Sequence, residues 1–181
     1  MRIIAGRLKG RIFHDPPGHH SHPMSEKARG GLFNALGDVE GLTVLDAMAG
    51  SGALAFEAIS RGAKSAVAIE QKRAPYGAIK HSINDLGISK EVKAVNADAS
   101  SWSSHNRTKK FDIVLLDPPY NHPQFDLLDK LVLHAKTGGI VVVSWPGHEL
   151  PPAFDSCKIV TDKNYGDAQL VFYRKTGRGK A

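Results

Sequence analysis

The strongest constraint on the fold is the alternation of short apolar runs with stretches of helical periodicity. Strands that alternate with helices form βα units, which predict a parallel sheet covered by helices on both faces. The expected strands are LTVLDA (42–47), SAVAIE (65–70), VKAVNA (92–97), FDIVLLD (111–117) and GIVVVSW (139–145). The expected helices between them are residues 53–61, 74–85, 100–104 and 125–135.

The two ends of the chain depart from this pattern. CKIVTD and AQLVFYRK, joined by KNYGD, predict an antiparallel strand pair that finishes the sheet. Ser25 is expected to cap a helix that runs through Leu36 and stops near Gly37. Residues 1–23 are expected to form a basic arm, with a short strand pair turned at its glycines and a loop in DPPGHHSHP. The sequence therefore predicts one domain, with an arm and loop at 1–23 and the main α/β unit at 24–181.

Charge and composition narrow the class of protein. The chain of 181 residues has a formal net charge of +6, which favours an acidic partner, nucleic acid ahead of a membrane surface. The single cysteine, Cys157, excludes an internal disulfide framework, and its apolar neighbours predict packing. No apolar run has the length of a membrane span, and the N-terminus lacks a secretory signal, so a cytoplasmic location is expected.

Acidic residues close the strands at the edge where ligands bind in an open parallel sheet. They are Asp46, Glu70, Asp98 and Asp117. Gly50 and Gly52 follow the first strand, where glycine lets the backbone approach a ligand closely. Glu70 is placed to accept hydrogen bonds from a ribose diol. This constellation fits a dinucleotide or S-adenosylmethionine.

The position of Asp46 favours the second of these cofactors. A carboxylate directly before the glycine turn tolerates a cationic ligand better than a pyrophosphate. A nicotinamide oxidoreductase is the weakest alternative, because it gives no task to the motif Asp-Pro-Pro-Tyr that follows the fourth strand.

That motif, residues 117–120, combines a stiff strand exit with hydrogen-bond acceptors. The Asp117 carboxylate and the Pro118 carbonyl can accept both protons of an exocyclic amino group, which aims the nitrogen lone pair at a methyl donor. Tyr120 offers a flat face on which an extruded base can stack. The motif therefore predicts methyl transfer to a nucleobase amino group, with a Pro-rich strand exit and a packed Tyr120 as the simpler alternative.

The motif, together with DAMAGSGALAFEAISRGA and SEKARGGLFNAL, resembles the RsmD-type methyltransferases, which methylate guanine N2 in bacterial small-subunit ribosomal RNA. The resemblance runs from RIIAGRLKGR to YGDAQLVFYRK. It implies a Rossmann-like class I methyltransferase fold, with a seven-stranded, mostly parallel sheet, helices on both faces and an antiparallel C-terminal pair. It also implies S-adenosylmethionine as cofactor and 16S rRNA, in the small subunit or its precursor, as partner of a monomer.

The resemblance assigns roles by matching position. Asp46, Gly50 and Gly52 would line the methionine end of the cofactor, Glu70 the ribose, Asp98 and Ala99 the adenine, and Asp117, Pro118 and Tyr120 the target base. RNA contacts are expected from Arg2, Arg7, Lys9, Arg11, His22, Lys27 and Arg29. The chain departs from the family where His22-Pro23-Met24 replaces Arg-Pro-Thr, where Met48 and Ala55 replace Phe and Gly, and where Ser82 replaces Asn.

Three further points complete the expectations. The cluster HHSH at 19–22 lacks the paired ligand sets of a structural zinc site, so no metal is expected. Trp145 walls the base pocket or packs in the core. The rival functions are a DNA adenine-N6 or cytosine-N4 methyltransferase and a non-catalytic RNA-binding assembly factor on the same fold; methylation of naked DNA, or RNA binding without transfer, distinguishes them.

Overall fold

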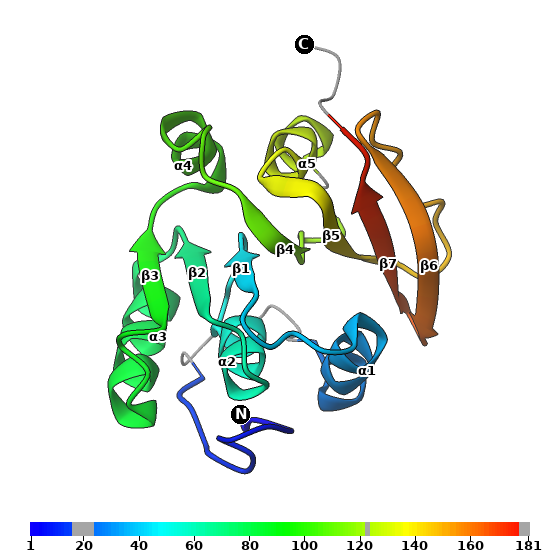
Figure 1. Ribbon diagram of the computed structural model, residues 1–181. Helices are drawn as coiled ribbons and strands as arrows, with labels where there is room; N and C mark the ends of the chain where they lie inside the picture. Colours follow the sequence, from blue (N-terminus) through cyan, green and yellow to red (C-terminus); the bar gives the residue numbers. More distant parts are fainter. Residues whose placement is uncertain (16–23, 122–123, 178–181) are drawn as a thin grey trace.

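The computed structural model describes residues 1–15, 24–121 and 124–177, and these contain seven strands and five helices (Figure 1). The strands are β1 (Thr43–Asp46), β2 (Ser65–Glu70), β3 (Val92–Asn96), β4 (Phe111–Leu116), β5 (Ala135–Pro146), β6 (Cys157–Tyr165) and β7 (Ala168–Lys175). The helices are α1 (Glu26–Leu36), α2 (Ala53–Ser60), α3 (Arg73–Leu86), α4 (Ala99–His105) and α5 (Phe125–Val132). The predicted order of elements is confirmed.

The strands form one sheet in the order β3-β2-β1-β4-β5-β7-β6. The first five strands are parallel to one another, whereas β7 pairs antiparallel with both β5 and β6. From β1 the chain adds β2 and β3 on one side and then returns to add β4 on the other. This reversal between β1 and β4 is the position at which open α/β sheets bind ligands.

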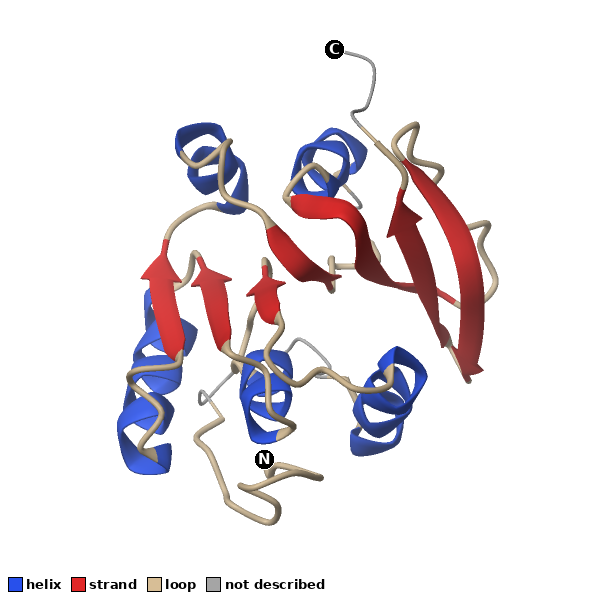
Figure 2. Cartoon of the chain, in the orientation of Figure 1, coloured by secondary structure: helices blue, strands red, loops and turns tan. Residues whose placement is uncertain are grey.

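Helices cover both faces of the sheet, as expected (Figure 2). Successive residues of a strand point to opposite faces, so Val44 belongs to one apolar cluster and Leu45 to the other. The first cluster includes residues of α1, α2 and α3, and the second includes residues of α4 and α5. The fold class predicted from the sequence is therefore confirmed.

The N-terminal arm, residues 1–15, packs on the face that carries α2. Only one antiparallel bridge, Arg2 to Ile12, stands where a strand pair was expected, because the chain turns tightly between them with positive φ at both glycines. Ile3 and Phe13 are buried, and the Phe13 ring meets the Phe56 ring of α2 edge-on at 5.2 Å. The arm is thus anchored to the domain through its apolar side chains.

The predicted boundary between the fifth helix and the fifth strand is wrong. The helix α5 ends at Val132, and β5 already begins at Ala135, four residues ahead of the predicted start at Gly139. The Phe111 backbone N–H donates to the His134 carbonyl at 2.8 Å, which draws the chain into the sheet before the glycine pair is reached. The predicted cap at Ser25 is confirmed, since its hydroxyl accepts from the Ala28 N–H at 3.1 Å. Every helix in the described part of the chain is too short or too polar to span a bilayer.

Candidate active site

Three carboxyl groups gather at the carboxyl edge of β1, β2 and β4. Asp46 ends β1 and is 1% exposed, Glu70 ends β2 and is buried, and Asp117 directly follows β4. Burial raises the pKa of Asp46 to about 7, and the negative charges of Asp117 and then Glu70 add to this rise. The edge therefore concentrates negative charge with little solvent to screen it, which suits a cationic ligand.

Two of these carboxylates also hold the glycine turn in place. Asp46 Oδ2 accepts from the Ala55 backbone N–H at 3.3 Å. Glu70 accepts from the Gly50 N–H at 3.0 Å through Oε2 and from the Lys72 N–H at 2.8 Å through Oε1. The end of β1 is thereby tied to the first turn of α2, and the end of β2 is tied to the glycine turn.

The glycines of this turn differ in what surrounds them. Gly52 has φ +80°, and a Cβ atom there would lie 2.8 Å from the Phe56 ring, so any other residue is strained and crowded. Gly50 has φ +55°, and no atom lies within 4 Å of the position that its Cβ would take. Gly52 thus fixes the turn, while the space beside Gly50 is open to a ligand.

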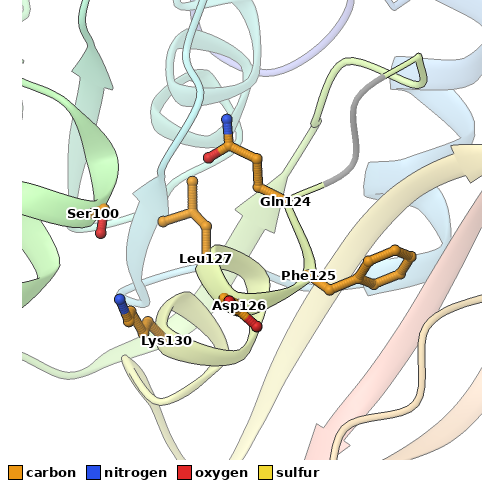
Figure 3. Close-up of a pocket in the computed structure, with 6 residues that line it drawn as sticks. All are labelled: Ser100, Gln124, Phe125, Asp126, Leu127 and Lys130. Atoms are coloured by element: carbon orange, nitrogen blue, oxygen red, sulfur yellow. The ribbon is translucent and has the colours of Figure 1, made fainter.

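A cavity of about 460 Å³ lies between α4, which follows β3, and α5 (Figure 3). Asp98 caps α4 by accepting from the Ser101 N–H at 2.9 Å, and Ala99 is buried. Ser100 forms one side of the cavity, opposite the first turns of α5. The lining residues are Ser100, Gln124, Phe125, Asp126, Leu127 and Lys130. The volume lies in the range of small-molecule sites.

The Asp-Pro-Pro-Tyr motif leaves the sheet next to the Asp46 turn. Pro118 is buried, and the Tyr120 side chain is exposed. The Tyr120 hydroxyl lies 2.6 Å from the Ser144 Oγ, and the nearby Ser144 hydroxyl partly offsets the effect of burial on the pKa of Asp117. Burial raises the pKa of both Asp117 and Tyr120 above their ordinary values. Ser144 therefore holds the Tyr120 hydroxyl and lies close to the acid of the motif.

Ser144 is a site residue that the sequence analysis missed. It is 4% exposed and lies near the carboxyl end of β5, which neighbours β4 in the sheet. The signal in the sequence was a single polar residue inside the apolar run GIVVVSW. Trp145 follows it, is 2% exposed and donates from Nε1 to the Leu150 carbonyl at 3.0 Å, so the core alternative for this residue is confirmed.

The predicted RNA contact of Arg29 is wrong. Its side chain is fully buried, where no nucleic acid can reach it. Nη2 donates to the Arg2 carbonyl at 2.7 Å, and Nε lies 3.7 Å from Glu57 Oε2. Glu57 is also fully buried and accepts from the backbone N–H groups of Ile4 and Ala5. Arg29 and Glu57 therefore fix the N-terminal arm through hydrogen bonds to its backbone at residues 2, 4 and 5.

The other basic residues of the prediction lie at the surface. Arg2 forms an ion pair with Glu26 at 3.0 Å, and Arg7 forms one with Glu91. Arg11 donates to the Asp85 carbonyl at 2.9 Å. Lys9 and Lys27 are exposed, and His22 lies outside the described residues.

A comparison with protein families places the chain in one of them. The model described as "Conserved hypothetical protein 95" matches residues 1–174, which is nearly the whole chain. Ribosomal RNA small subunit methyltransferase D of Escherichia coli strain K12 is 30% identical over 186 residues, covering 100% of this chain and 93% of that relative.

Comparison with solved structures also finds methyltransferases with a similar fold. A candidate methyltransferase of Escherichia coli, yhhF, superposes with a TM-score of 0.83 at 27% identity, over 98% of this chain and 99% of the other. SMU.776, a candidate methyltransferase complexed with SAH, has a TM-score of 0.68 at 12% identity, over 82% of this chain and 48% of the other. The second likeness concerns the fold alone.

Proposed function

Since the chain belongs to the RsmD-type methyltransferase family, we propose that it transfers a methyl group from S-adenosylmethionine to the exocyclic N2 of a guanine in 16S rRNA. The substrate is the small ribosomal subunit or its precursor, and the enzyme acts in the cytoplasm as a monomer. The observation that carries the proposal is the meeting of the Asp46 turn with the Asp-Pro-Pro-Tyr motif at the β1/β4 edge.

The charge at this edge supports a sulfonium cofactor. The Asp46 carboxyl has a pKa near 7 because it is buried beside other acids, and a ligand with ammonium and sulfonium charges stabilises its ionised form. A pyrophosphate would meet the same carboxylates with the wrong sign. S-adenosylmethionine also supplies what the reaction needs, an electrophilic methyl group on a positively charged sulfur.

Different residues at this edge are assigned to different parts of the cofactor. Asp46 and the open space at Gly50 suit the methionine end, and Glu70, at the end of β2, suits the ribose. Asp98 and Ala99, at the start of α4, directly precede Ser100, which lines the cavity between α4 and α5, and this position suits the adenine. A relative in fold, SMU.776, is a candidate methyltransferase complexed with SAH, which supports the same class of cofactor here.

The motif residues act on the amino group of the base. The Asp117 carboxylate and the Pro118 carbonyl accept hydrogen bonds from its two protons and orient the nitrogen lone pair toward the methyl group. The raised pKa of Asp117 makes its carboxylate a better acceptor for the proton that the nitrogen loses after methylation. Tyr120, held by Ser144, presents its ring to the flipped base.

RNA binding is assigned to basic residues at the surface. Arg7, Lys9 and Arg11 of the arm and Lys27 of α1 supply contacts to the phosphate backbone that weaken as salt rises. Such contacts position the substrate without reading its sequence, so the choice of one guanine comes from RNA shape and base flipping.

The test is transfer of labelled methyl groups to small ribosomal subunits that lack their native modification, followed by nucleoside analysis. The expected product is N2-methylguanosine at a single site, and fully modified subunits serve as the matched control. Methylation of naked duplex DNA in place of the subunits would refute the proposal in favour of a DNA amino-methyltransferase. Tight RNA binding without transfer would refute it in favour of an assembly factor.

A further inference from the structure

We propose that His14, His81 and Asp85 form a surface site for one zinc ion that fastens the N-terminal arm to helix α3. The nitrogen and oxygen ligand atoms of these side chains all lie within 4.8 Å of one another. Two imidazoles and a carboxylate are ligands that Zn²⁺ prefers, and a water molecule completes four-coordination.

The geometry is close to that of a zinc site. Tetrahedral bonds of about 2.0–2.1 Å place neighbouring ligand atoms about 3.3 Å apart. His81 Nε2 lies 3.6 Å from Asp85 Oδ2, and His14 Nε2 lies 2.8 Å from the same oxygen. The ligand atoms of the two histidines lie within 4.8 Å of each other, so a shared ion requires the imidazoles to move closer together. All three side chains are about half exposed, which leaves them free to adjust.

The backbone around the site holds the ligands in reach of one another. His81 and Asp85 are one turn apart on α3, so both side chains project from the same face of the helix. The His14 N–H donates to the Ser82 Oγ at 3.0 Å, and Ser82 is fully buried. The imidazoles of His14 and His81 lie next to each other, with centroids 4.2 Å apart and ring planes tilted by 53°. The arm thus brings its ligand to a position fixed by the core.

The electrostatic setting favours a cation. Asp85 is next to the last residue of α3, where the helix dipole is negative. Arg11 donates to the Asp85 carbonyl and opposes a cation there, which keeps the site weaker than a buried structural one.

The proposed consequence of zinc binding is that the N-terminal arm is attached more firmly to the domain. Among the described arm residues, His14 lies nearly at the end, and the basic residues Arg7 and Arg11 precede it. A metal bond from His14 to α3 adds a second attachment for this segment, because Phe13 already packs against Phe56 of α2. The ion therefore stiffens the surface that the proposed function assigns to RNA contacts. The site itself does not depend on that function.

The test is calorimetric titration of the full chain, without an affinity tag, with zinc chloride in a non-coordinating buffer. We expect one ion per chain, and at least about tenfold weaker binding in His81→Gln and in Asp85→Asn. The matched control is His105→Gln, an exposed histidine at the end of α4, which should leave the affinity unchanged. Unfolding temperatures of all variants establish that they fold.

A second control addresses the histidines at 19, 20 and 22, which lie outside the described residues. Replacing these three by glutamine should leave zinc binding intact, and loss of binding in that variant overturns the proposal. Unchanged affinity in His81→Gln overturns it as well. Hydrogen exchange of residues 1–15 supplies an independent readout: zinc should slow it in the parent chain and leave it unaltered in His81→Gln.

Discussion

The burial of the Asp46 carboxyl group predicts how the free energy of unfolding depends on pH, which can be tested without a substrate. Its pKa rises from 3.8 to about 7 on folding, mainly because the group is 1% exposed. The folded protein therefore binds a proton that the unfolded chain has lost throughout this window. Stability from this group is fully present below pH 3.8 and is lost as the pH rises through 7.

The magnitude follows from the size of the shift. At about 1.4 kcal/mol per pKa unit, the rise from 3.8 to about 7 corresponds to about 4 kcal/mol, of which about 3 kcal/mol falls between pH 5 and pH 8. Asp46→Asn removes the titrating group. The free energy of unfolding of the variant relative to the parent should therefore rise by about 3 kcal/mol between these two pH values.

Urea unfolding of both proteins at pH 5 and pH 8 measures this difference. The Asp46 carboxylate accepts from the backbone N–H group of Ala55, and an amide replaces this contact at a cost of about 1 kcal/mol. To first order that cost is the same at both pH values and cancels in the comparison, as do titrating groups that do not interact with Asp46. Equal stability differences at pH 5 and pH 8 would refute the assignment of a raised pKa to Asp46.

Three further variants test other parts of the site. Gly52→Ala places a Cβ at φ +80° against the Phe56 ring and should lower stability by about 1–3 kcal/mol, seen as a lower Tm; an unchanged Tm contradicts the fixed turn. Glu57→Gln leaves the buried Arg29 charge uncompensated and should lower the free energy of unfolding in urea by about 3–5 kcal/mol, whereas a loss below 1 kcal/mol contradicts the pairing. Ser144→Ala should slow methyl transfer about 10- to 100-fold at unchanged cofactor affinity; an unchanged rate contradicts its positioning role.

The sequence predicted the fold because the features that determine it are local. Apolar runs bounded by turn residues mark the strands, and the acids at their ends are drawn together by the parallel order of the sheet. The predicted strand SAVAIE matches β2 residue for residue, and the cap at Ser25 follows from its own side chain. The meeting of Asp46 with Asp117 was predictable for the same reason.

The errors and omissions concern contacts between distant segments. Arg29 lies in a polar stretch, and its burial depends on the arm folding over α1 and α2. The proximity of His14 to His81 has the same origin, since the arm reaches α3 only in the folded chain. The early start of β5 reflects the pairing of Ala135 with Phe111 in the neighbouring strand. The glycines at 138 and 139 indicate a loop in the sequence, so this pairing could not be predicted from it.

The most direct test of the proposed mechanism is methyl transfer by Asp117→Ala to unmodified small subunits, measured together with its affinity for S-adenosylmethionine. The mechanism predicts that transfer is abolished while cofactor binding is nearly intact, because it assigns Asp117 to the base and the cofactor to residues at the ends of β1, β2 and β3. Transfer at the full rate in this variant would contradict the assignment of the reaction to the Asp-Pro-Pro-Tyr motif.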